Sequence, residues 1–264
     1  MTNRTMPDLF NMDGRIAIIT GGGTHLGKDM TEALAELGAH VYIASRRAEL
    51  CEETAAGLRA RSLKVTALSC DVTEEESVNS LVEEVVEREG RLDVFIANAG
   101  GSATTAHPPH GKVDEFRWTL EKNLTSTYIC AQAAGRVMIP QKSGSIITLG
   151  SIASRLASDP RIYNENFKRS GAPYMAAKAG VLVLTKALAA EYSPHGVRVN
   201  CICPGQIPND LTDKAQVEKF RTMNAFHRTG LAEDLKGACA LLASDAGKWI
   251  TGTDILVDGG WSIW

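Results

Sequence analysis

Two side chains at helical spacing have the types needed to move a proton. Tyr174 and Lys178 are four residues apart, so in a helix they would lie on the same face. A free tyrosine has a pKa of about 10 and is a poor base at neutral pH, whereas a nearby ammonium favours the phenolate and lowers that pKa. Such a pair can exchange a proton with a substrate oxygen near pH 7. On its own the pattern is typical of a solvated helix face, so the chemistry depends on what surrounds it.

The chain around this pair alternates short β-branched runs with longer helical patterns. We expect strands at 15–20, 40–44, 64–69, 94–97, 145–149, 198–202 and 254–257, and helices near 25–38, 47–61, 74–89, 115–138, 174–192 and 232–243. This alternation predicts an α/β fold with a parallel sheet and helices on both faces. No repeat or linker divides the chain, so we expect one domain over 1–264. Its substrate loops are expected at 101–113, 152–173 and 205–228, after strand ends.

Composition narrows the class of protein. The 264 residues include 44% hydrophobic and 22% charged residues, with a net charge of −3 and a pI of about 6.1. That balance does not favour nucleic acid or a membrane surface as a partner. The six cysteines form no C-x-x-C pair and resemble small core residues of a reducing compartment. No apolar run of signal-peptide or membrane-spanning type occurs, so we expect a cytoplasmic protein.

A glycine-rich turn follows the first expected strand and precedes a helix. Glycines let a backbone turn tightly and approach a pyrophosphate, which the N–H groups of a helix N-terminus then bind. The expected contacts are Gly21, Gly23, Thr24, His25, Leu26 and Gly27. An NAD-binding unit would usually carry an acid near the end of the second strand, but here the chain has Ser45, Arg46 and Arg47. Guanidinium groups pair well with phosphate, so the sequence favours NADP over NAD, which stays possible. Alternatively, the two arginines only cap the next helix.

Two further strand ends carry candidate cofactor contacts. Asp71 and Val72 follow the third strand, where Asp71 could accept a hydrogen bond from an adenine amino group or cap the next helix. Asn98, Ala99 and Gly100 follow the fourth strand. The Asn98 side chain could join neighbouring strands, while the two small residues leave room for a cofactor.

Together these motifs resemble the short-chain dehydrogenase/reductase family over almost the whole chain. The resemblance rests on the turn at 20–27 and on Asp71, Asn98-Ala99-Gly100, Asn123, Ser151, Tyr174, Lys178, Pro204-Gly205 and Asp258-Gly259-Gly260. It implies a Rossmann-type, doubly wound parallel sheet of about seven strands. It also implies that Tyr174 is the general acid/base, that Lys178 lowers its pKa and holds the nicotinamide ribose, and that Ser151 holds the substrate oxygen. Asn123 would hold a water linked to Lys178. Pro204 and Gly205 would support the nicotinamide ring, and Ile207 would be a further cofactor contact.

Three features depart from the family pattern. His25 stands where the turn normally has a glycine, and we favour a helix-start residue without a chemical role over a cofactor contact. The segment between Ser151 and Tyr174 is longer than in most members. The Pro204-Gly205 pair is not followed by the threonine often found there.

The start of the chain, the long loop and Pro208 resemble the gluconate 5-dehydrogenase-like branch. This resemblance implies interconversion of a secondary alcohol and a ketone on a sugar, sugar acid or polyol. We expect an arginine of the long loop to pair with a substrate anion, although a solvated loop is as compatible with the sequence. The candidate substrate contacts are Ser151, Arg155, Arg161, Arg169, Tyr163, His107 and Gln206. His107 and His110 lack nearby acidic or thiol ligands, so no metal is expected.

Two other functions stay open. The turn and the run at 43–46 also resemble dienoyl-CoA reductases of the same family, although Tyr174 argues for carbonyl chemistry. A catalytically silent NADP-binding protein is the second alternative. The apolar helices near 115–138 and 174–192 suggest a homotetramer or homodimer, as the family commonly forms. The tail carries Trp261 and Trp264, which we expect at a subunit interface or beside the active site.

Overall fold

The structure, a computed structural model, describes residues 3–102, 107–163 and 169–264. Its centre is a seven-stranded sheet in the order β3-β2-β1-β4-β5-β6-β7, and every neighbouring pair is parallel. The strands are β1 (Ile16–Thr20), β2 (His40–Ser45), β3 (Val65–Ser69), β4 (Val94–Ala97), β5 (Gly144–Leu149), β6 (Val197–Pro204) and β7 (Asp254–Val257). The order reverses between β1 and β4, which is where doubly wound sheets bind their ligands. The predicted fold class is confirmed.

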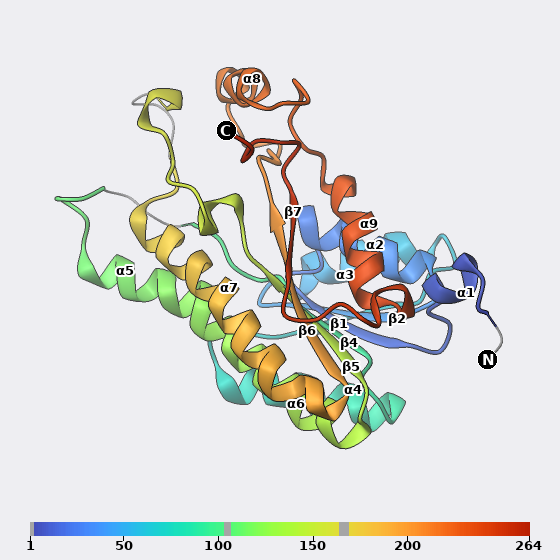
Figure 1. Ribbon diagram of the computed structural model, residues 1–264. Helices are drawn as coiled ribbons and strands as arrows, with labels where there is room; N and C mark the ends of the chain where they lie inside the picture. Colours follow the sequence, from blue (N-terminus) through green and yellow to red (C-terminus); the bar gives the residue numbers. More distant parts are fainter. Residues whose placement is uncertain (1–2, 103–106, 164–168) are drawn as a thin grey trace.

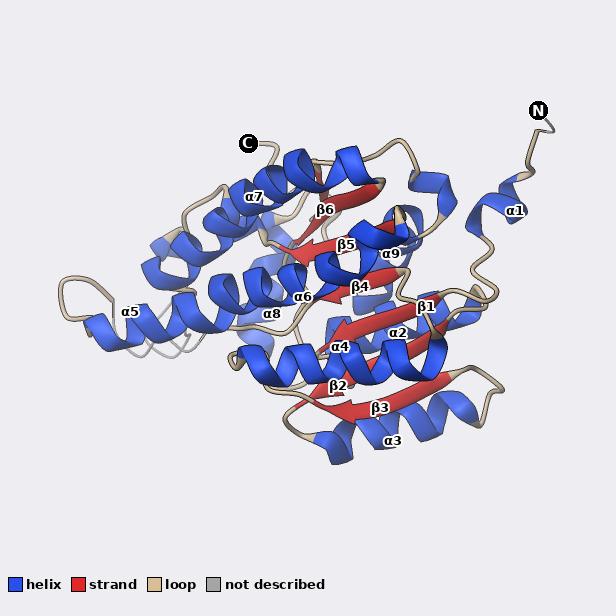
Figure 2. Cartoon of the chain, turned by 90° about the horizontal axis from the view of Figure 1, so that it is seen from below, coloured by secondary structure: helices blue, strands red, loops and turns tan. Residues whose placement is uncertain are grey.

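Helices cover both faces of the sheet because neighbouring strand residues point to opposite sides. Ile16 and Ile18 of β1 belong to one buried cluster and Ala17 and Ile19 to the other. The first cluster is covered by α4 (Glu75–Glu89), α6 (Ser126–Gln141) and α7 (Ala172–Tyr192), which lie together in Figure 2. The second is covered by α2 (His25–Glu36), α3 (Ala48–Arg59) and α9 (Lys236–Ala243), grouped in Figure 1. None of the described helices combines the length and hydropathy needed to cross a membrane.

Three elements differ from the sequence prediction. The single helix expected near 115–138 is divided into α5 (Val113–Leu120), a π-helical turn (Glu121–Thr125) and α6. The short helix α1 (Met6–Phe10) and the helix α8 (Lys214–Met223) were not predicted. Thr5 caps α1, and Asp213 caps α8 by accepting hydrogen bonds from the N–H groups of Ala215 and Gln216. These caps stabilise two helices whose apolar patterns are too short to be recognised in the sequence.

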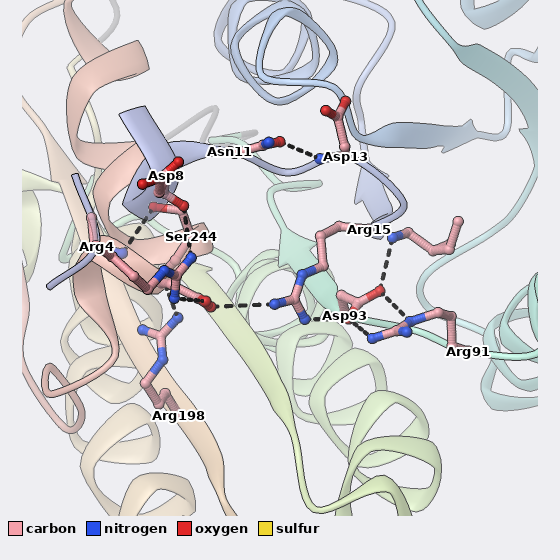
Figure 3. A network of polar contacts seen from close by, with 12 residues as sticks. Arg4, Asp8, Asn11, Asp13, Arg15, Arg91, Asp93, Arg198 and Ser244 are labelled. Carbon is pink, nitrogen blue, oxygen red and sulfur yellow. Dashed lines mark hydrogen bonds and ion pairs between the residues drawn. The ribbon is translucent and has the colours of Figure 1, made fainter. Parts of the chain in front are cut away.

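A network of ion pairs closes the end of the sheet where the strands begin. The buried carboxylate of Asp93 accepts hydrogen bonds from the backbone N–H of Ile16 at 2.9 Å, from Arg15 at 3.0 Å and from Arg91 at 2.8 Å (Figure 3). A second carboxylate, Asp245, pairs with Arg4 at 2.6 Å. The network joins β1 to the segment before β4 and attaches the N-terminal segment to the end of α9. At the opposite end of the sheet, where the strands stop, the loops carry the candidate site.

Candidate active site

Tyr174, Lys178 and Ser151 converge at the carboxyl end of β5. α7 begins at Ala172, so Tyr174 stands in its first turn and Lys178 one turn later on the same side. The Lys178 ammonium is buried, donates a hydrogen bond to the carbonyl of Leu149 at 2.7 Å, and lies 5.7 Å from the centroid of the Tyr174 ring. Ser151 follows β5 after one residue, Gly150, and hydrogen-bonds with Tyr174. The helical spacing read from the sequence therefore does bring the proton-transfer groups together.

Burial governs the protonation of this group. It raises the pKa of the Tyr174 hydroxyl above its ordinary value, and the hydrogen bond with Ser151 opposes this only in part. Burial also lowers the pKa of Lys178 to about 8. The pKa of Tyr174 is therefore not lowered as expected, because desolvation has the largest influence on it. At neutral pH the tyrosine carries its proton and can donate it.

A single hydroxyl fixes the turn that carries Ser151 to the helix that carries Lys178. The Ser154 hydroxyl accepts a hydrogen bond from the backbone N–H of Ser151 at 3.1 Å and donates one to the carbonyl of Lys178 at 2.9 Å. Ser154 also ends the one-turn helix (Ile152–Ser154) that follows the strand. The sequence offered no signal for this role, since both partners are backbone groups.

Asn123 is fully buried in the π-helical turn and its side chain is satisfied by backbone groups. Its Oδ1 accepts from the N–H of Gly101 at 2.9 Å, and its Nδ2 donates to the carbonyls of Gly101 and Thr119 at 3.0 and 2.9 Å. A Cβ at Gly100 would stand 2.7 Å from Asn123 Oδ1 and 3.7 Å from Lys178 Nζ. Asn123 thus fixes the loop after β4 next to Lys178, and only glycine fits between the two.

A cavity of about 510 Å³ runs along the carboxyl ends of the strands from the Arg46 region to Tyr174. With the exception of Gly23, every residue predicted to contact the cofactor lines it. Gly23 faces α3, where an added Cβ would come within 3.0 Å of Cys51, so its small size serves packing. The sequence did not single out the lining residues Ala44, Cys70, Thr73, Gly101, Trp118, Lys122, Leu149 and Gly150.

The glycine turn shows why this cavity can receive a pyrophosphate. An added Cβ at Gly27 would lie 2.1 Å from the carbonyl oxygen of Gly21, so a side chain there would push α2 away from the turn. Asn98 holds the turn by donating its Nδ2 to the carbonyls of Thr20 at 2.9 Å and Gly21 at 3.2 Å, the role expected for it. His25 opens α2 with φ 46°, the left-handed region that favours glycine, and its ring lies over the cavity 3.3 Å from the Pro208 carbonyl.

The far end of the cavity is cationic. Arg46, Arg47 and Lys122 line it, and the one acid among the described lining residues is Asp71, 3.8 Å from Arg46. Burial and the charge of Arg46 lower the pKa of Lys122, so the two cations lie near each other. Asp71 also accepts hydrogen bonds from the N–H and hydroxyl of Thr73 at 3.0 and 2.7 Å, so it stabilises the local turn rather than the first residue of α4. Three cations against one carboxylate fit an added phosphate group.

The comparisons with known proteins agree with this geometry. A family model described as enoyl-(acyl carrier protein) reductase matches residues 23–262. An NADP-dependent mannitol dehydrogenase of Alternaria alternata is 35% identical over 98% of this chain and 96% of its own. A sorbose reductase of Schizosaccharomyces pombe is 36% identical over 97% of this chain and 99% of its own. A gluconate 5-dehydrogenase of Burkholderia cenocepacia, solved with NADP and tartrate, has a TM-score of 0.89 at 30% identity over 98% and 100% of the two chains.

The chain belongs to the short-chain dehydrogenase/reductase family. As a short-chain dehydrogenase/reductase it is an oxidoreductase that acts on CH–OH groups, as the resemblance implied.

A second cavity of the dehydrogenase, of about 410 Å³, adjoins the first at the chemical centre. The two share Ser151, Tyr174, Gly205 and Ile207. Of the predicted substrate contacts, Ser151, Tyr163 and Gln206 line this second cavity. It also includes side chains that the sequence reasoning missed, namely Leu156, Ser158, Asp159, Ile162, Phe220 and Met223. Trp261 and Trp264 are part of its wall, so the tail lies beside the active site, one of its two expected places.

Two of the three arginines expected to contact the substrate, Arg155 and Arg161, lie outside the second cavity. Arg155 is ion-paired with Asp254 of the neighbouring edge strand, and Arg161 binds the Asp159 carboxylate with its Nε and a terminal nitrogen. Neither lines the cavity, because each has a carboxylate partner of the same chain that holds it elsewhere.

Arg169 and His107 also fall outside the two cavities. The Arg169 Nε donates to the His107 ring at 3.4 Å, which joins the two long loops to each other. His110 is exposed. Within the described ranges no three His, Cys, Asp or Glu side chains group together as metal ligands. Part of each long loop, 103–106 and 164–168, lies outside the described residues.

Proposed function

We propose that this dehydrogenase uses NADP to interconvert a secondary alcohol and a ketone on a sugar or polyol. The observation that carries the proposal is a continuous cavity with a cationic phosphate end at Arg46, Arg47 and Lys122 and a proton donor, Tyr174, at the other. The mannitol dehydrogenase and sorbose reductase relatives, whose names give such substrates, support it.

The residues around the reacting carbon would divide the work between them. When bound, NADPH supplies the hydride. The Ser151 hydroxyl holds the ketone oxygen, and the Tyr174 hydroxyl, kept protonated by its burial, gives that oxygen a proton. Lys178 would hold the ribose and pass protons toward the tyrosine, and Asn123 positions the loop after β4 beside it. A protonated tyrosine is the form that ketone reduction needs.

The test follows NADPH absorbance with a panel of ketoses, and NADP⁺ reduction with the corresponding polyols. Turnover with the ketoses supports the proposal, and Tyr174→Phe should remove nearly all of it while leaving NADPH affinity unchanged. Turnover with NADH alone would overturn the cofactor assignment. Tight NADPH binding without turnover of any alcohol or ketone would instead support the silent alternative, and turnover of an enoyl thioester would support the alkene-reductase alternative.

We also propose that the protein assembles as a homotetramer or homodimer in the cytoplasm. Large apolar side chains are exposed on α5, α6 and α7, among them Trp118, Tyr128 and Val183, at 45%, 44% and 68% exposure. Contiguous exposed apolar side chains favour burial against a partner. The six cysteines are free thiols, which supports a reducing compartment. Sedimentation of the wild type and of Val183→Glu tests the interface, since a monomeric wild type would contradict it.

A further inference from the structure

The substrate cavity is walled by aromatic rings from three separate segments. Tyr163 of the long loop meets Phe220 of α8 edge-on at 6.2 Å between ring centroids, and Phe220 meets Trp261 of the tail edge-on at 5.8 Å. Aromatic faces attract the C–H bonds of polyols and sugars while leaving the hydroxyl groups free to hydrogen-bond elsewhere. We name Tyr163, Phe220 and Trp261 the aromatic wall.

The polar groups beside the aromatic wall are uncharged. Tyr163 hydrogen-bonds with Ser158 and Gln206, and all three line the cavity together with Ser151. Hydroxyl and amide groups can each donate and accept, which matches the hydroxyl groups of a polyol. These side chains can therefore exchange the hydrogen bonds they make with one another for bonds to a substrate.

No lysine or arginine is among the described residues that line this cavity. The one carboxylate side chain among the described lining residues, Asp159, is paired with Arg161, whose side chain is 89% exposed. Arg155 is held by Asp254. The charge of Arg169 reaches the Tyr163 hydroxyl, and its Nε donates a hydrogen bond to the His107 ring. Among the described residues that line this cavity, no cation is present to pair with a substrate carboxylate, which would lie near an acid and an aromatic surface.

We propose that the substrate is an uncharged polyol or ketose, that sugar acids are excluded, and that Trp261 is a specificity-determining residue. This inference rests on the proposed function and narrows it. The burial of an unpaired carboxylate is costly, whereas a hydroxymethyl group at the same place is satisfied by Ser158 or Gln206. The enzyme therefore distinguishes substrates by the group on the terminal carbon that lies farthest from the ketone.

Two ketones that differ only at that terminal carbon test this inference. L-Sorbose and 5-keto-D-gluconate share carbon skeleton and configuration and differ only in that the terminal carbon farthest from the ketone is a hydroxymethyl group or a carboxylate. With wild-type enzyme and NADPH, we expect kcat/KM for L-sorbose to be about 100-fold higher, because the carboxylate is unpaired. Equal or faster reduction of 5-keto-D-gluconate would overturn this inference while leaving the proposed function intact. If neither this pair nor any other ketose of the panel is reduced, the two proposals fail together.

Trp261→Leu tests the aromatic wall in the same assay. We expect KM for L-sorbose to rise about tenfold with a smaller change in kcat, while the Kd for NADPH stays the same. The matched control is Trp249→Leu, because Trp249 is 97% exposed and lies by the cavity at the amino ends of the strands. If both variants shift KM equally, or if Trp261→Leu shifts neither KM nor kcat, Trp261 does not select the substrate.

Discussion

Replacing Lys178 with methionine should make the protein more stable at neutral pH while abolishing its activity. The pKa of the buried ammonium is about 8 in the folded chain against an ordinary value of 10.5. For a basic group this depression means that the unfolded chain binds more protons between about pH 8 and 10.5, so stability increases as pH rises through that window. Below pH 8 the buried ammonium destabilises the folded chain by the full amount. A gap of about 2.5 pKa units corresponds to about 3 kcal/mol.

Methionine keeps most of the apolar length of the side chain and removes the charge. It also loses the 2.7 Å hydrogen bond from Lys178 to the Leu149 carbonyl, which contributes about 1 kcal/mol. We therefore expect Lys178→Met to raise the free energy of unfolding by about 2 kcal/mol at pH 7. At pH 9.5 the buried ammonium destabilises the wild type by only about 1.5 kcal/mol, so the stability advantage of Lys178→Met should shrink to about 0.5 kcal/mol.

Urea unfolding of both proteins at pH 7 and pH 9.5, at equal protein concentration, measures this difference. Lys186→Met is the matched control, since Lys186 is an exposed lysine of the same helix and its removal should give no pH-dependent difference. A stability difference between Lys178→Met and wild type that stays constant over this pH range would refute the argument that burial of the ammonium is costly.

Three further changes test other parts of the structure. Lys122→Gln should weaken NADPH binding roughly tenfold in a fluorescence titration and leave NADH binding unchanged, because the lost charge faces the extra phosphate of NADPH. An equal loss of affinity for both cofactors would contradict this role. His25→Gly should be more stable than His25→Ala by about 1 kcal/mol in thermal unfolding, because φ is 46° there, and an equal stability would show that the turn relaxes. Asp93→Asn should cost about 3 kcal/mol, because Arg15 and Arg91 would lose the carboxylate between them; a change below 1 kcal/mol would mean that solvent replaces it.

The cofactor half of the site was predictable because its signals are local. A glycine turn between a strand and a helix, and small or polar residues directly after strands, identify the cavity without any knowledge of distant contacts. Gly23 was the exception. Its neighbour Cys51 lies on the next helix, so the sequence could not distinguish a glycine that contacts the cofactor from one that packs.

The substrate half depends on contacts between distant segments, which the sequence does not display. Arg155 has the right type and place in the chain for a substrate ligand, but its partner Asp254 is on the last strand. The division of the helix near 115–138 was hidden for a related reason, since the apolar pattern continues through the π-helical turn. In contrast, Asp213 was a readable signal for α8, because an aspartate that precedes a helical segment commonly caps it.

The Ser154 hydroxyl allows substrate specificity to evolve without a change in the catalytic groups. It attaches the Ser151 turn to the carbonyl of Lys178, and the long loop begins only after this attachment. Insertions and deletions from Arg155 to Gly171 can then reshape the substrate wall without moving the groups that handle the proton. A chain built in this way can acquire a new substrate through changes in one loop and the tail, while its reaction stays the same.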